Sequence, residues 1–265
     1  MEMKRALDLL NENGISAQAV TVTKNGKTIP GIAVGSGKVR PAIYEDQIKG
    51  FTLDTELLEF VRFQEKTAPD WDIKDKLTKN YIMENAVSCI RPSVEDEVVS
   101  FPAYGDLQEY IRIVVENEAD GFHGSFQLNA DHLKQLELNA SEIRAAARKN
   151  LRERTEIKPL SMVLLEFMGD EANVSVPEDE PVFVATNKEK FYGAAVMLLG
   201  DVLNSFCAEQ GIKEVVIIPS SIHEILLVKE PSDPSVINQM IRDVNENEVA
   251  EEERLSDHCY IFRAS

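Results

Sequence analysis

Hydroxyl, imidazole and carboxylate side chains gather in one short segment, Ser220-Ser221-Ile222-His223-Glu224, directly after an apolar run. These are the groups that hydrolases use as nucleophile, base and acid, and functional sites often form where an apolar strand ends. In an extended strand Ser221 and His223 would share one face, with Glu224 on the other. The segment lacks the G-x-S-x-G elbow that exposes a catalytic serine.

The same residues also fit a structural role, which the sequence favours. The serines would close a turn between two strands, and His223 would be hydrogen-bonded at the end of the sheet, with Ser221 as its partner. The alternative is a hydrolase with Ser221, His223 and Glu224 as catalytic candidates, helped by Asp257 and His258.

Metal and nucleotide sites are not expected. The histidines His123, His132, His223 and His258 are scattered, and no cysteine pair has ligand spacing. A site could arise only if the fold brought Asp257, His258 and Cys259 to His223. The glycine-rich segment Gly35-Ser36-Gly37-Lys38 resembles the end of a phosphate-binding loop, but Val39 follows where magnesium binding needs Ser or Thr. We therefore expect no cofactor and no metal.

The charge balance argues against nucleic-acid and membrane partners. The chain has 28 basic and 46 acidic residues and a net charge of −18, which repels phosphate backbones and anionic lipid surfaces. One predicted helix departs from this balance, because Arg144, Arg148 and Arg152 recur every four residues, and further basic residues extend to Lys158. We interpret this basic face as paired with acidic neighbours within the chain; an anion site is the alternative.

The cysteines and the N-terminus indicate a cytoplasmic protein. Cys89, Cys207 and Cys259 are odd in number, far apart and flanked by apolar residues, as expected of thiols in a reducing compartment. The first residues show no signal-peptide pattern, and no apolar run reaches the roughly 20 residues of a membrane span.

The positions of these groups depend on an α+β fold with antiparallel or mixed sheets and helices packed on one face. Residues 1–75 read as an N-terminal α-β-β-β-α region, with a boundary near Trp71. Asn25-Gly26 predicts a hairpin turn that pairs Val20 to Thr23 with Thr28 to Val34.

Residues 76–265 read as the main α+β region. Its last third gives the order β-α-β-β-α-β, a split βαβ with a ferredoxin-like tendency. In this region we expect strands at Tyr81 to Cys89, Ala194 to Leu198 and His223 to Val228, and a helix near Pro159 to Met168.

Three groups of residues carry a resemblance to a known family: Thr186-Asn187-Lys188 with Gly193-Ala194-Ala195; Ile218-Pro219-Ser220-Ser221-Ile222-His223-Glu224-Ile225; and Asp243-Val244-Asn245 with Leu255-Ser256-Asp257. With these the chain resembles an uncharacterised bacterial family of Firmicutes, many from the gut, the domain of unknown function 5688. The resemblance is specific across Val182 to Phe262 and looser toward the N-terminus. It implies relatives but no activity and no assigned catalytic residues.

The sequence therefore favours a non-catalytic cytoplasmic protein-interaction or accessory module, whose partner would be an unknown protein. The rival hypothesis is the hydrolase-like enzyme centred on Ser221, His223 and Glu224. The two differ in whether these side chains converge in a pocket with the geometry that catalysis needs.

Overall fold

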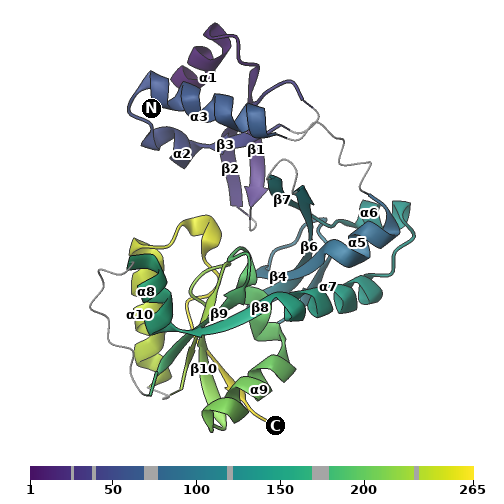
Figure 1. Ribbon diagram of the computed structural model, residues 1–265, viewed down its shortest axis with the longest axis vertical. Helices are drawn as coiled ribbons and strands as arrows, with labels where there is room; N and C mark the ends of the chain where they lie inside the picture. Colours follow the sequence, from purple (N-terminus) through teal and green to yellow (C-terminus); the bar gives the residue numbers. More distant parts are fainter. Residues whose placement is uncertain (25–26, 38–39, 69–76, 118–121, 169–178, 230–232) are drawn as a thin grey trace. The chain divides into compact units, whose positions relative to one another are not determined.

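The computed structural model describes residues 1–24, 27–37, 40–68, 77–117, 122–168, 179–229 and 233–265 (Figure 1). The chain forms two compact units. The first contains Met1–Ile82 and Val114–Phe126, and the second contains Met83–Ile113 and Gln127–Ser265. The division into residues 1–75 and 76–265 stays a proposal, and its boundary near Trp71 lies outside the described residues.

In the first unit, helices pack on a three-stranded antiparallel sheet of order β1-β2-β3. Its elements are α1 (Met3–Glu12), β1 (Ala17–Lys24), β2 (Lys27–Val34), β3 (Ala42–Tyr44), α2 (Glu45–Gly50) and α3 (Asp54–Thr67). The pairing Val20↔Gly31 confirms the predicted hairpin, whereas Asn25-Gly26 lies outside the described residues. Leu10, Ile32 and Leu57 meet in a core fully removed from solvent.

The predicted strand at Tyr81 to Cys89 is wrong in its first half. Residues Lys79–Asn85 form helix α5, and strand β4 (Ala86–Pro92) begins only after it. The side-chain amide of Asn150 donates to the carbonyls of Met83, Glu84 and Ala86 at 3.0, 3.1 and 2.8 Å. These bonds satisfy carbonyls at the end of α5, and a partner so distant in sequence leaves no local signal.

In the second unit, helix α7 (Ala140–Arg154) packs against β4. Strand β4 belongs to a four-stranded sheet of order β4-β6-β5, in which β6 pairs antiparallel with β4 and β5 and also pairs with β7. The end of β6 from Val114 onward and β7 up to Phe126 belong to the first unit. The other elements of this region are β5 (Ser100–Pro102), β6 (Leu107–Asn117), β7 (Phe122–Gln127) and α6 (Ala130–Gln135).

A five-stranded antiparallel sheet, of order β12-β10-β11-β9-β8, forms the rest of the second unit (Figure 1). Its strands are β8 (Thr155–Pro159), β9 (Val182–Asn187), β10 (Glu214–Ile218), β11 (Ile225–Val228) and β12 (Tyr260–Arg263). The helices between them are α8 (Leu160–Met168), α9 (Gly200–Gln210) and α10 (Pro234–Asn247), together with the short 3₁₀ helices η2 (Gly193–Leu198) and η3 (Glu251–Glu253).

Helices cover both faces of this sheet. Phe183 packs edge-on against Phe206 of α9, with ring centroids 5.0 Å apart, while Val216 packs with Ile237 and Ile241 of α10. The strand register places Phe183 and Val216 on opposite faces. The α+β class is confirmed, but the ferredoxin-like arrangement is not, because α9 and α10 lie on opposite faces and β12 pairs with β10 and not with β9.

The predicted strand at Ala194 to Leu198 is also wrong, because these residues form the 3₁₀ helix η2. Residues Gly193 to Met197 are all buried. A short apolar run that is buried all round does not distinguish a strand from a helix by its periodicity. The predicted helix near Pro159 to Met168 is confirmed from Leu160 onward as α8.

Candidate functional site

A cavity of about 730 Å³ lies over the β9 and β11 strands of the second unit. The side chains of Val184, Thr186 and Leu226 line it from the sheet, and Leu160 and Val163 line it from α8. Four residues of the candidate segment also line it: Ser220, Ser221, His223 and Glu224. The structure therefore brings these sequence-predicted residues together at one concave surface.

Ser220 to Glu224 form the turn between β10 and β11. The Ser221 N–H donates to the Glu224 carbonyl at 3.3 Å. The Ser221 hydroxyl accepts the His223 N–H and donates to Glu224 Oε1, both at 3.0 Å, and the Ser220 hydroxyl donates to the same oxygen at 3.2 Å. The serines thus close the turn, as the structural interpretation expects.

The imidazole of His223 has partners other than the Ser221 hydroxyl. Its Nδ1 accepts the Tyr192 N–H at 3.2 Å, and its Nε2 faces Glu253 Oε1 at 3.5 Å. The ring also lies 5.1 Å from the Phe191 ring, and the side chain is 18% exposed. The expected hydrogen bond between Ser221 and the ring is absent, and the Ser221 hydroxyl accepts the backbone N–H of His223 instead.

The backbone N–H groups of the turn are already used. Besides Ser221, the Ile222 N–H donates to the Glu253 carbonyl at 2.9 Å, and the His223 N–H donates to the Ser221 hydroxyl. An oxyanion hole needs unpaired donors aimed at the developing charge. Between Ser221 and His223 the structure leaves no backbone N–H free for that role.

Residues 186–194 hold the turn from the other side. The N–H groups of Gly193 and Ala194 donate to the carbonyls of His223 and Ile222 at 3.0 and 3.3 Å, and the Thr186 hydroxyl donates to the His223 carbonyl at 2.7 Å. The sequence reasoning did not assign roles to Thr186 and Gly193, although both stand in the segments that carry the family resemblance.

Carboxylates outnumber cations around the cavity. Five glutamates line it against two lysines, Lys158 and Lys190. Both lysines contact Glu166, at 2.9 and 3.4 Å. The hydrogen bond from Lys158 lowers the pKa of Glu166 below its usual value. The remaining glutamates of the lining are Glu156, Glu224, Glu248 and Glu253.

The second predicted group, Asp257, His258 and Cys259, does not join His223. The His258 Nε2 faces Asp106 Oδ1 at 3.2 Å, and the Asp257 carboxylate accepts a hydrogen bond from Asn245 at 2.8 Å. Burial opposes ionisation of Asp106, but hydrogen bonds from Tyr260 and Ser256 outweigh it and lower the pKa of this carboxyl.

No set of three metal-ligating side chains exists in the part of the chain that the structure describes. Of the other histidines, His132 caps its own helix by accepting the Asn129 N–H at 3.2 Å. The side chain of His123 lies outside the described residues.

The basic face of α7 is paired within the chain, as expected. Arg144 and Arg148 both contact the buried carboxylate of Glu109 at 2.7 Å, and Arg152 contacts Asp201 at 2.6 Å. Glu109 also accepts the Ser88 hydroxyl at 2.7 Å. The guanidinium groups thus neutralise carboxylates of the same chain.

The fold and site define an α+β protein with an acidic, partly apolar cavity at the hydrogen-bonded turn between β10 and β11. Comparison with known families shows that the chain belongs to a family of unknown function, DUF5688, which matches residues 5–264. No curated protein and no solved structure matches the chain. Within the described residues, no helix is both long and apolar enough to cross a membrane.

Proposed function

We propose that this chain is a non-catalytic protein-interaction or accessory module of the bacterial cytoplasm, and that the cavity at the Ser220–Glu224 turn is where it binds its partner. The observation that carries the proposal is that the hydroxyls of Ser220 and Ser221 and the N–H groups of residues 221–223 already have acceptors within the chain. A cavity with an apolar floor and a few polar groups, but no assembled reacting groups, is suited to binding. The reduced thiols and acidic composition agree with a cytoplasmic location.

A basic, partly apolar segment is the partner that best complements this cavity. The excess of glutamates over lysines favours a cationic side chain, and Val184, Leu226 and Val249 supply apolar contact area. A net charge of −18 also attracts basic partners over longer distances.

The rival hydrolase hypothesis has one observation in its favour, because Ser221, His223 and Glu224 do line one cavity. Acyl transfer, however, requires a base on the nucleophile and donors for the oxyanion. Ser221 bonds to Glu224 and not to the imidazole, and the backbone donors of the turn are committed.

A fluorophosphonate probe and a p-nitrophenyl ester series test the absence of serine chemistry. We expect no labelling of Ser221, and the same ester turnover in wild type and Ser221→Ala. Turnover that disappears in Ser221→Ala while the variant remains folded would establish the hydrolase instead.

Binding is tested by NMR titration with a short leucine–arginine peptide and a matched leucine–glutamate peptide. We expect the basic peptide alone to shift the amide signals of residues 220–224, and Glu253→Gln to weaken it several-fold. Glu246→Gln, on the exposed surface of α10, is the matched control. Equal shifts with both peptides would contradict the proposed charge selection.

A further inference from the structure

Strand β8 is an edge of the five-stranded sheet. It pairs with β9, and among the described residues no strand pairs with its other side. The Lys188 N–H donates to the Arg154 carbonyl at 2.9 Å, so these two residues are a hydrogen-bonded pair. This pair determines which residues of β8 direct their backbone groups toward β9. Because antiparallel pairs alternate, the backbone groups of Glu156 and Lys158 also point toward β9.

The backbone groups of the intervening residues therefore point away from the sheet. These are the carbonyls of Thr155 and Ile157 and the N–H of Ile157, because the carbonyl of Pro159 begins the hydrogen bonding of α8. Proline has no N–H, and the Thr155 N–H donates to the Arg152 carbonyl at the end of α7. The open edge of β8 thus offers two acceptors and one donor.

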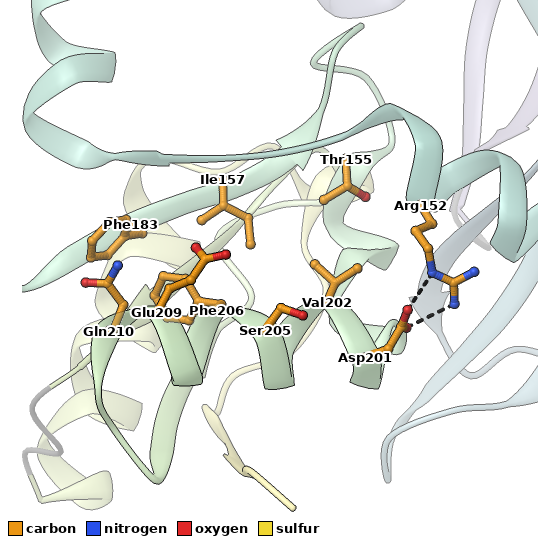
Figure 2. A pocket seen from close by; sticks show the side chains of 10 residues that line it. All are labelled: Arg152, Thr155, Ile157, Phe183, Asp201, Val202, Ser205, Phe206, Glu209 and Gln210. Carbon is orange, nitrogen blue, oxygen red and sulfur yellow. Dashed lines mark hydrogen bonds and ion pairs between the residues drawn. The ribbon is translucent and has the colours of Figure 1, made fainter.

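A groove of about 440 Å³ runs along the same edge, between β8 and α9 (Figure 2). In Figure 2, the side chains of Thr155 and Ile157 point from β8 toward α9, whose Val202 and Phe206 face them. Ile157, Val202 and Phe206 form an apolar part of the groove, and polar or charged side chains make up most of the remaining lining. The ion pair of Arg152 with Asp201, with nitrogen–oxygen contacts of 2.6 and 2.9 Å, lies at one end.

We propose that the β8 edge binds an extended segment of a partner protein as an additional strand, with apolar side chains seated in the groove between β8 and α9. An extended main chain supplies N–H groups to the carbonyls of Thr155 and Ile157 and a carbonyl to the Ile157 N–H. The side chains of two directly opposite residues lie on the same face of a sheet. The side chain of the partner residue opposite Ile157 therefore points into the groove, as that of Ile157 does.

A second copy of this chain is a poorer occupant of the edge. If two β8 strands paired about Ile157, Thr155 would face Pro159 of the other copy. Neither residue has a free N–H, so only the two Ile157 residues could bond. Two chains of net charge −18 also repel each other.

Charge selects the flanking residues of the partner segment. Glu209 adds a carboxylate to the groove, beside the neutral ion pair of Arg152 and Asp201. The partner segment is therefore one that alternates apolar and basic residues and has no proline opposite the acceptors. This inference goes beyond the proposed function, because it uses no residue of the Ser220–Glu224 turn.

Hydrogen exchange of the Ile157 amide, followed by NMR in the full chain, tests the proposal. The probe is an alternating lysine–valine peptide with blocked ends, at roughly millimolar concentration, where weak complexes are populated. We expect fast exchange in the free protein and a slowing by about tenfold or more with the peptide. Exchange at Glu156 should stay slow throughout, because its N–H points toward β9.

Two controls separate strand addition from general attraction. The same peptide with N-methylated valines keeps its charge and side chains but loses the N–H groups, and it should give no protection. Ser205→Trp, on the exposed side of the groove, should abolish protection by filling the groove, whereas Ser205→Ala should retain it.

Three outcomes would overturn the proposal. One is an Ile157 amide that is already protected in the dilute free protein, because the edge would then be covered. Another is equal protection by the N-methylated peptide. A third is protection of the Ile157 amide that increases with protein concentration in the absence of peptide. This result would show that a second copy of the chain binds the β8 edge. The ester and fluorophosphonate results at Ser221 are independent of all three.

Discussion

Gly193 lies so close to His223 that no side chain fits between them. A Cβ at Gly193 would stand 2.8 Å from the His223 carbonyl oxygen and 2.6 Å from the Asn187 backbone nitrogen, and it would collide with the Thr186 hydroxyl. This close approach allows the Gly193 N–H to reach the His223 carbonyl. The glycine therefore joins two segments of the family resemblance that lie about thirty residues apart in sequence.

Gly193→Ala should destabilise the protein by roughly 1 to 3 kcal/mol, because the atoms that the new methyl group meets are mostly backbone and cannot move aside cheaply. Urea denaturation followed by circular dichroism measures the change. Gly200→Ala is the matched control, since a Cβ there meets only Phe262 at 4.0 Å. The control should be neutral or slightly stabilising, because Gly200 is helical. Equal stability of the two variants would contradict the account.

His223 should also matter for stability. His223→Ala leaves the Tyr192 N–H without its acceptor, and a buried donor without a partner costs about 1 to 3 kcal/mol. The melting temperature should therefore fall by several degrees. In His223→Asn, the side-chain oxygen can accept in place of Nδ1 and should restore part of the loss. If thermal unfolding shows no difference between wild type and His223→Ala, the imidazole is not a structural element of this turn.

Local patterns were sufficient to predict much of the sheet and its turns. Asn25-Gly26 between alternating residues predicts the β1–β2 pairing, and the apolar spacing in Pro234 to Asn245 predicts α10. A turn closed by Ser220 and Ser221 was predicted, because short polar residues between two apolar runs favour turns. The strand expected from His223 begins only at Ile225, so the prediction was wrong for His223 and Glu224, which belong to the turn.

The cavity could not be predicted in the same way, because its lining comes from distant segments. Glu166 from α8 and Glu253 from η3 meet the turn only through the strand order of the sheet. In the sequence, Gly193 does indicate a contact of this kind, since a glycine beside an apolar run often marks a close approach of another backbone segment. Its partner could not be identified without the fold.

The cysteines should differ in their reaction with iodoacetamide. Burial raises the pKa of Cys89 to about 12 and also raises the pKa of Cys207 and Cys259. Cys89 and Cys207 are buried, whereas Cys259 is partly exposed. At mildly alkaline pH, mass spectrometry should find Cys259 alkylated first and the other two only after unfolding, because the thiolate must be both formed and accessible. Early modification of Cys89 would contradict the packing of β4.

The ion-pair network at Glu109 should make stability depend on pH. Burial opposes ionisation of this carboxyl, but hydrogen bonds from Arg148, Ser88 and Arg144 outweigh it and lower the pKa of Glu109. Because the pKa of Glu109 is lower in the folded than in the unfolded protein, its ionised form stabilises the fold at any pH above the unfolded-state pKa of about 4.3. This stabilisation is lost as the pH falls through the folded-state pKa. Arg148→Gln should cost about 2 kcal/mol or more at neutral pH, because a buried carboxylate loses a partner.

The pH dependence separates this electrostatic role from simple packing. Below about pH 4 the wild type should lose the contribution of Glu109 as well, so its free-energy difference from Arg148→Gln should shrink. Lys149→Gln is the matched control on the same helix. Lys149 is 71% exposed and pairs with Glu153 at 3.7 Å, and exposed pairs of this kind contribute at most about 0.5 kcal/mol. Denaturation curves across the acid range measure both variants. A difference that stays constant with pH would show that Arg148 acts through its packing and not through the charge of Glu109.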